Sequence, residues 1–488
     1  MKGFVKRRGA LLCLAVVSLV LILPPIIYQY PYPSISDDVP QYLHIITNLA
    51  DGDIMDKENY SFCWPNFGHT IDCSYRNGAP ALLGLFCKLT NADPYWTYYI
   101  FHYLMLIVIA ICIWFFCKKV FNKWTGYIGV LFVLFGATPV LRYSLYDQIF
   151  NITNWLVFGL MGSLALLTWI KTKRFYYALV SLMLFCICVL FHSSTGLEIY
   201  LCVGFFLTCL CVYRFFKRQP YKAIFVYTVI YSVICGMLLY FFATEARSLA
   251  THVVTGVSIK ADMGIDSHVP IFYFFTQDTS MLLLIFGALA FWYVIKKRIA
   301  NIGLWMMVAY GFVLTVSILI NRLEPARSAQ DLGVILLFIY AGAMGIALYH
   351  ARTYPKIIKA KKTIIFMILV SCVPVLYGWF QYHCAITAID QQAMSRISEL
   401  GGTWNCSTQI NPSLYELFID EPYKKSDADY TIYRNQRQTA ATDPDNRYTI
   451  IGFLTREGNE SVESDYEGLL VDSVFTQGEF KIVIYRNE

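Results

Sequence analysis

The chain has 488 residues, of which 57% are hydrophobic, 17% aromatic and only 15% charged. An ordinary soluble domain carries about 25% charged residues, so this composition excludes one. The net charge of +6 does not indicate a nucleic-acid-binding protein, because the basic residues stand in short connections between apolar runs.

The apolar residues gather in runs of about 16 to 23, close to the length of a helix that crosses a bilayer. They predict an all-α polytopic membrane protein with about eleven transmembrane helices. The first run ends at Pro24-Pro25 without a small-residue cleavage site, which favours a retained anchor over a signal peptide. The predicted spans are 9–27, 95–117, 124–141, 152–170, 176–191, 197–213, 223–243, 279–295, 302–320, 332–349 and 363–380.

Basic residues mark alternate connections between these spans and predict their orientation. The first ten residues and every second connection contain Lys or Arg but neither Asp nor Glu. Short connections of this kind stay on the cytoplasmic side. We therefore expect a multi-pass protein of the cell membrane with a cytoplasmic amino terminus and an extracytoplasmic carboxyl terminus.

The first outer loop, residues 28–94, contains the acidic pair Asp37-Asp38 directly before a predicted amphipathic helix at 40–49. This helix is expected to lie on the outer membrane surface. Asp38 could be a reactive carboxylate at that surface, or it could simply cap the helix that it precedes. The apolar face of the helix consists of Tyr42, Ile45, Ile46 and Leu49.

A second apolar segment of this loop, residues 79–89, is too short to cross a bilayer and predicts an interfacial or re-entrant helix. If it crossed the membrane, every later loop would change sides and the pattern of basic connections would break.

Ionisable side chains gather at the outer ends of the predicted spans. Such groups cost free energy near hydrocarbon unless they face protein or water, so they usually mark a site. We expect them to share one cavity that opens outward. The candidate substrate-binding residues among them are Arg327, Arg142, Asp147, Glu324, Glu198 and His192.

Several of these residues have a simpler interpretation. Asp147 and Glu198 stand near the first turn of a predicted span, where the helix dipole favours a carboxylate. Arg142 could anchor a span end by snorkelling, and His192 could be an ordinary polar turn residue. Arg327 is harder to explain in this way. It lies between two spans, and a guanidinium there can bind a lipid-linked phosphate through two hydrogen bonds.

An outward Asp and an outward Arg at membrane depth fit a lipid-phosphate sugar donor. The Asp would deprotonate an acceptor hydroxyl as it attacks the anomeric carbon. The leaving phosphate needs positive charge, which either Arg or a divalent metal could supply. The sequence contains no Gly-rich phosphate loop, nucleotide motif or cytoplasmic domain, so a soluble nucleotide-sugar donor is not expected.

In these features the chain resembles the GT-C superfamily of integral-membrane glycosyltransferases, in particular its protein O-mannosyltransferase-like and lipopolysaccharide-core glycosyltransferase-like members. The resemblance rests on the acidic pair in a long first outer loop, on the turn 142–147 and on the segment 324–331 that leads into the tenth span. It covers residues 1 to about 383, and the ending 478–485 is similar to the tail of many members.

The resemblance implies a polyprenyl- or dolichyl-phosphate sugar donor and an inverting transfer of a hexosyl or pentosyl group. The acceptor would be a hydroxyl of a lipid, glycan or protein. Asp38 or Asp37 would be the general base, with Asp38 preferred. The Trp-Trp-Asp-Tyr-Gly signature of oligosaccharyltransferases is absent, which argues against transfer en bloc to asparagine.

The chain is expected to divide into a transmembrane GT-C-like domain, residues 1–383, and a small α/β extracytoplasmic module, residues 384–488. In the module, alternating patterns predict strands at 429–433, 448–454 and 480–485, and 391–400 predicts a helix.

Two other functions stay open from the sequence: a polysaccharide polymerase or ligase, and a transporter of lipid-linked glycans. The early position of the acidic loop argues against the first. The spans are nearly free of charge at mid-depth and the chain lacks two matched halves, which argues against the second.

Overall fold

The computed structural model describes residues 39–51, 61–63, 70–72, 78–135, 149–242, 281–320, 325–351, 388–402, 404–406, 447–454, 470–477 and 480–486. These residues fall into two compact units. Unit 1 contains the apolar helices from Tyr99 onward, and unit 2 contains the elements of the first outer loop together with those of the carboxyl-terminal tail.

Within the described residues, six helices are long and apolar enough to cross a membrane, and three shorter apolar helices accompany them. The chain is therefore a multi-pass membrane protein. Each predicted span that falls in this part of the chain coincides wholly or partly with a helix. The spans at 9–27 and 363–380 lie outside the described residues, so the count of eleven and the orientation of the termini stay predictions.

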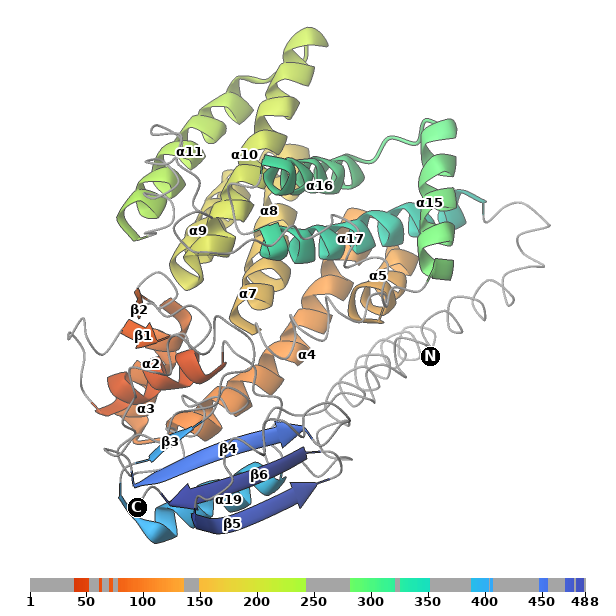
Figure 1. Cartoon of the computed structure of the whole chain (residues 1–488). Coiled ribbons are helices and arrows are strands. Elements are labelled where there is room, and N and C mark those ends of the chain that lie inside the picture. The colour runs from red at the N-terminus through yellow and green to blue at the C-terminus, as the bar shows by residue number, and fades with distance from the viewer. Residues whose placement is uncertain are drawn as a thin grey trace, which may run out of the picture. The chain divides into compact units, whose positions relative to one another are not determined.

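The helices between Pro94 and Ala351 have the following bounds: α4 Pro94–Val120, α5 Lys123–Phe135, α7 Ile149–Thr153, η4 Asn154–Gly159, α8 Leu160–Thr172, α9 Phe175–Phe191, α10 Ser193–Phe216, α11 Lys222–Phe242, α15 Met281–Lys296, α16 Ile302–Ile320 and α17 Pro325–Ala351. Helix α17 packs against α16, α15 and α5, and α9 packs against α8, α10 and α11 (Figure 1). Helix α10 also contacts α16 and so joins the two groups.

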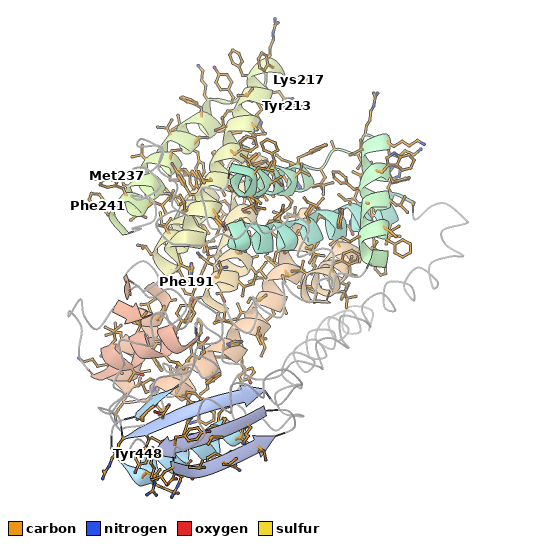
Figure 2. All side chains as sticks on the ribbon, viewed as in Figure 1. Phe191, Tyr213, Lys217, Met237, Phe241 and Tyr448 are labelled. Carbon is orange, nitrogen blue, oxygen red and sulfur yellow. The ribbon has the colours of Figure 1, made fainter. Side chains whose placement is uncertain are left out.

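Large apolar side chains also cover the outside of unit 1. Figure 2 shows Met237 and Phe241 projecting from α11, where they are 55% and 59% exposed. A helix that is apolar on its exposed side as well as on its buried side suits a lipid surrounding better than water.

Gly196 allows α10 to approach α9 closely. A Cβ atom at this position would lie 2.7 Å from the Cα of Val189 and 2.8 Å from the carbonyl oxygen of Cys188. Both are backbone atoms, which cannot rotate out of the way. Small residues at helix–helix contacts commonly permit such an approach in membranes.

Gly196→Ala should therefore destabilise the fold by about 1–3 kcal/mol, the usual cost of overpacking. Gly204→Ala is the matched control on α10, since a Cβ there would meet only the Cε1 of Tyr231, at 4.0 Å. The control should be neutral or slightly stabilising, because Ala favours the helix over Gly by about 1 kcal/mol. The thermal midpoints of the two purified variants test this, and equal midpoints would contradict it.

In unit 2, the first outer loop forms two helices and a short hairpin. Helix α2, Val39–Asp51, buries the predicted apolar face: Tyr42 and Ile46 are 1% and 0% exposed. Helix α3, Gly78–Thr90, packs on it, since a Cβ at Gly84 would lie 2.6 Å from the Cβ of Leu49. The hairpin pairs β1, Ser61–Cys63, with β2, Thr70–Asp72.

Helix α3 has 13 residues, or about 20 Å, and is therefore too short to span a bilayer, as expected. Its outer side carries an exposed apolar stripe at the spacing of one helical face. The stripe is composed of Leu82, Leu85, Phe86 and Leu89. The stripe fits an interfacial helix, and the position of the helix on a membrane stays a prediction.

The tail contributes helix α19, Ala388–Leu400, and a four-stranded sheet. The sheet has the order β3-β4-β6-β5, with β3 parallel to β4 and the other pairs antiparallel, and α19 packs on β5 and β6 (Figure 1). The structure confirms the predicted helix and the predicted strands at 448–454 and 480–485. The predicted strand at 429–433 lies outside the described residues. Strands β3 and β5 were not predicted. The strands are β3 Trp404–Cys406, β4 Tyr448–Leu454, β5 Leu470–Gln477 and β6 Phe480–Arg486.

The division of the chain at residues 383 and 384 stays a prediction. Unit 2 combines the tail with the elements of the first outer loop instead of consisting of the tail alone.

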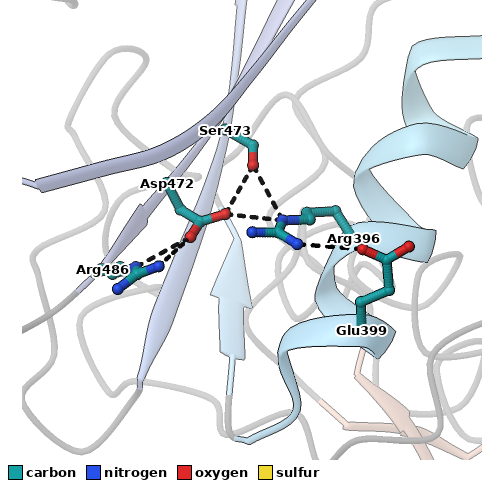
Figure 3. Close-up of polar contacts among 5 residues, drawn as sticks. All are labelled: Arg396, Glu399, Asp472, Ser473 and Arg486. Atoms are coloured by element: carbon teal, nitrogen blue, oxygen red, sulfur yellow. Dashed lines mark hydrogen bonds and ion pairs between the residues drawn. The ribbon is translucent and has the colours of Figure 1, made fainter.

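A buried carboxylate, Asp472, ties α19 to the sheet at the irregular register between Val471 and Ser473. The Arg396 Nε donates to its Oδ2 at 3.0 Å, and Arg486 donates to its Oδ1 from Nε at 3.0 Å and from Nη2 at 2.6 Å (Figure 3). Ser473 adds a hydrogen bond of 2.7 Å. The Asp472 side chain is 1% exposed, so its charge depends on these donors.

Burial acts to raise the pKa of Asp472, but the hydrogen bonds from Ser473, Arg486 and Arg396 outweigh it and lower the pKa from 3.8 to about 2. The ionised form is thus favoured by folding. Its contribution to stability is complete above about pH 4 and is lost as the pH falls toward 2.

Asp472→Asn should accelerate amide hydrogen exchange in β5 and β6 at pH 7 relative to the parent chain. The difference should shrink as the pH is lowered toward 2, because the parent carboxyl then becomes protonated as well. Glu399→Gln is the control, since Glu399 is 67% exposed and pairs only with Arg396 among the described contacts. A difference that does not depend on pH would argue against an ionic origin.

Candidate functional site

Polar side chains gather inside unit 1 at the amino-terminal ends of α7, α10 and α17. The opposite ends of these helical segments are basic: α8, which continues α7, has Lys171 in its last turn, and α10 has Arg214. The polar cluster is therefore at the end predicted to face outward. We call the following residues the outer cluster: Asn151, Asn154, Trp155, His192, Thr195, Glu198 and Asp331.

The first contact of the outer cluster joins α7 to α10. The hydroxyl of Thr195 donates to the Oδ1 of Asn151 and also lies 3.0 Å from the Nδ1 of His192. Since the hydroxyl has one proton and donates it to Asn151, His192 must donate from Nδ1. In the neutral tautomer that has its proton on Nδ1, Nε2 is the acceptor nitrogen of the ring.

The second contact joins η4 to the end of α9. The side-chain amide of Asn154 donates to the carbonyl oxygens of Cys188, at 2.8 Å, and of His192, at 3.0 Å. Both amide protons are thus used across the helix–helix boundary. These bonds fix the backbone that leads from α9 into α10, where His192 and Thr195 lie.

The third contact joins η4 to α17. The indole Nε1 of Trp155 donates to the Oδ2 of Asp331 at 2.7 Å, and both side chains are buried, at 3% and 2% exposure. Glu198 is also buried, at 5% exposure. Glu198 and Asp331 both act electrostatically on the thiol of Cys202, one turn further along α10, so the two carboxylates belong to one region.

The backbone at Asn154–Gly159 is π-helical, whereas the flanking α7 and α8 are α-helical. Isolated π turns inside α-helices are frequent at functional sites, because the wider turn changes the direction of neighbouring side chains. Here it begins at Asn154 and Trp155, adjacent residues that reach two different helices.

The outer cluster combines two buried carboxylates, an imidazole and carboxamide and hydroxyl groups. This set can accept and donate hydrogen bonds to a polyol such as a sugar, and its carboxylates can hold or move a proton. Among the described residues, no group of three or more His, Cys, Asp or Glu side chains is placed to hold a metal ion.

The structure brings together two of the residues predicted from the sequence, His192 and Glu198. Arg327 lies in α17 four residues before Asp331, so the two positions share a face of that helix, while the Arg327 side chain is outside the described atoms. Five predicted site residues lie outside the described residues: Asp37, Asp38, Arg142, Asp147 and Glu324.

Glu198 is not in the first turn of its helix, because α10 begins at Ser193. The helix dipole acts mainly in the first turn, so it explains this buried carboxylate less well than the sequence suggested.

Sequence reasoning missed Asn151, Asn154, Trp155 and Thr195. The available signal was a pair of Asn residues three apart, within the first turns of an otherwise apolar span.

The fold of the chain matches known membrane enzymes, although no protein-family model and no curated protein matches its sequence. ArnT from Cupriavidus metallidurans, in the apo state, aligns with a TM-score of 0.54 at 11% identity over 99% of this chain and 98% of its own. The Archaeoglobus fulgidus oligosaccharyltransferase in its apo form aligns with a TM-score of 0.53 at 10% identity, over 90% of this chain and 69% of its own. Both are GT-C glycosyltransferases. The chain has the GT-C fold.

The resemblance noted from the sequence is therefore confirmed at the level of fold. The ArnT alignment includes nearly the full length of both chains, so the likeness extends beyond the apolar helices. The GT-C fold also agrees with the multi-pass character of unit 1.

Trp155→Phe should destabilise the protein by about 1–3 kcal/mol, since it leaves the buried Asp331 without its indole donor. Trp169→Phe is the matched control on α8, because Trp169 packs its ring against Tyr227 at 4.9 Å and Phe retains an aromatic ring there. Thermal unfolding of both variants gives the comparison. If Trp155→Phe and Trp169→Phe lose the same stability, the hydrogen bond contributes nothing beyond packing.

Proposed function

We propose that the protein is a membrane glycosyltransferase that moves a sugar from a polyprenyl- or dolichyl-phosphate donor to an acceptor hydroxyl on the outer face, with inversion at the anomeric carbon. The observation that carries the proposal is the GT-C fold over nearly the whole chain, together with the acidic pair Asp37-Asp38 in the first outer loop. The acceptor is a lipid, a glycan or a protein.

Asp38 is the general base in this mechanism, and Asp37 is its neighbour and alternative. The carboxylate takes the proton of the acceptor hydroxyl while the oxygen attacks the anomeric carbon from the side opposite the phosphate. The bond between the anomeric carbon and the phosphate oxygen breaks, and the lipid phosphate leaves with its negative charge.

Arg327 binds the leaving phosphate. A guanidinium suits this task because it stays charged and can donate two parallel hydrogen bonds to phosphate oxygens. Its position one turn before Asp331 supports the proposal, since Asp331 is held inside unit 1 by Trp155. Arg142, Asp147 and Glu324 are proposed to bind substrate as well.

Glu198 and His192 bind the donor sugar. Their burial at the predicted outer end of α10 supports this, as does the contact that joins His192 to Thr195 and Asn151. Sugar hydroxyls can donate to the Glu198 carboxylate and to the acceptor nitrogen of the His192 ring.

A divalent metal could share the neutralisation of the phosphate. The Archaeoglobus fulgidus oligosaccharyltransferase has been solved in complex with Zn and sulfate, and its TM-score with this chain is 0.54. In this chain the carboxylate of the acidic pair that does not act as the base would be a ligand, which fits a hard divalent cation. Loss of transfer in a chelator, and recovery with added metal, would establish this role.

The proposal is tested with membranes that contain the protein, radiolabelled polyprenyl-phosphate sugars and a lipid extract as acceptor source. Label should move to a new lipid, glycan or protein product. The double variant Asp37→Asn/Asp38→Asn should lower the rate by at least about 100-fold, since general-base catalysis contributes about 10²–10⁴-fold. The single variants then assign the base.

Asp93→Asn is the control carboxylate. Asp93 caps α4 by accepting from the Trp96 N–H at 2.8 Å, and the Asn carbonyl retains that acceptor. Full transfer by the double variant would refute the mechanism. Movement of the donor across the membrane without transfer would favour a transporter instead.

A further inference from the structure

A second polar surface lies at the helix ends opposite the outer cluster. It consists of the turn between α8 and α9 and the turn between α10 and α11, and both turns are basic. The α8–α9 turn contains Lys173 and Arg174, and the end of α10 leading into α11 contains Arg214, Lys217 and Arg218. Figure 2 shows Lys217 projecting from this end of α10 together with Tyr213. We call these five basic residues the basic face.

The two turns adjoin in space. Trp169, in the last turn of α8, packs its ring against Tyr227 of α11 with the centroids 4.9 Å apart. The Lys173 ammonium lies 5.8 Å from the centre of the Trp169 ring, which also brings it toward α11. Burial lowers the pKa of Lys173, and the charge of Arg214 lowers it further. A cation of one turn therefore acts electrostatically on a cation of the other.

In each turn, one basic residue has a left-handed backbone conformation, which is strained for a residue with a Cβ atom. Lys173 has φ of 60° and Arg218 has φ of 53°, the left-handed conformation in which helices usually place Gly. The Lys173 N–H donates to the Trp169 carbonyl at 2.7 Å, as a glycine at this position would. A Lys or Arg with a Cβ pays a conformational cost that Gly avoids, so the turn itself gives no reason for the positive charge.

Acidic partners for these charges are absent from the described part of unit 1. The chain from 149 to 242 contains a single acid, Glu198, which belongs to the outer cluster at the opposite end of α10. Asp331 also belongs to the outer cluster. The basic face therefore has a surplus of positive charge that an external anion would neutralise.

Exposed aromatic side chains surround the basic face. Phe175 and Phe216 are 70% and 77% exposed, and Tyr213 and Phe215 are 56% and 58% exposed. Aromatic side chains beside Lys and Arg at helix ends are typical of the boundary between lipid headgroups and acyl chains. An anion that binds here would thus be attached to an acyl chain.

We propose that the basic face binds the phosphate headgroup of an anionic phospholipid, between the α8–α9 turn and the α10–α11 turn. Lys173 and Arg214 contact the phosphate, Lys217 and Arg218 add long-range attraction, and the exposed aromatic rings contact the acyl chains. This site is separate from the outer cluster and does not depend on the proposed glycosyl transfer.

The test uses native mass spectrometry of the purified full chain in detergent, titrated with phosphatidylglycerol or with phosphatidylcholine. The parent chain should bind its first phosphatidylglycerol at least about tenfold more tightly than phosphatidylcholine, because each basic residue near an anionic headgroup contributes about fivefold. Inorganic phosphate at millimolar concentration should not displace the lipid, since it lacks the acyl chains.

Lys173→Gly is the decisive variant. It removes the charge but relieves the left-handed strain, so the protein should fold at least as well as the parent chain. Its affinity for phosphatidylglycerol should fall about fivefold, while that for phosphatidylcholine should not change. Arg298→Gly is the matched control, because Arg298 is also a basic residue with a left-handed φ, 51°, in a different turn. It should change the affinity less than twofold.

Three results would overturn the proposal. These are equal affinity of the parent chain for both lipids, an equal loss of affinity in Lys173→Gly and Arg298→Gly, and displacement of the lipid by inorganic phosphate.

Discussion

A polar group inside a membrane protein must find its hydrogen-bond partners within the protein, because the surrounding hydrocarbon offers none. Unit 1 meets this constraint across helix boundaries: Trp155 donates to Asp331 of α17, and Asn154 donates to the backbone at the end of α9. Sliding any of these helices would break these buried hydrogen bonds. The constraint therefore fixes the arrangement of the helix ends that carry His192 and Glu198.

The π turn at Asn154–Gly159 is the local consequence of that constraint. An uninterrupted α-helix would present Asn154 and Trp155 about 100° apart around its axis. The wider π turn changes the angle between these two side chains. It does so where Asn154 must reach α9 and Trp155 must reach α17. Since a π turn is less favourable than an α turn, two buried hydrogen bonds give a physical reason for its presence.

The sequence predicted well those features that depend on local pattern. Run length identified the spanning helices because the bilayer sets their length, and the face of Tyr42 and Ile46 identified α2 because one side of that helix is buried. Strand β5 was not predicted because Asp472 interrupts its alternation of apolar and polar residues. The charge of this buried side chain is stabilised by hydrogen bonds from α19 and β6. The Trp155–Asp331 bond escaped as well, since it joins residues 176 apart in the chain.

The two ends of α10 differ in how they could hold a phosphate. At the outer end, Arg327 lies one turn from Asp331, and Glu198 is buried in the same region, so any phosphate there competes with carboxylates for positive charge. In the proposed mechanism, this competition would favour release of the lipid phosphate after transfer. At the basic face, Lys173 and Arg214 repel each other, and the acids of the described part of unit 1 belong to the outer cluster. A phosphate bound there would reduce the repulsion between these two cations and would not compete with an acid for them. This property suits a lipid that stays bound.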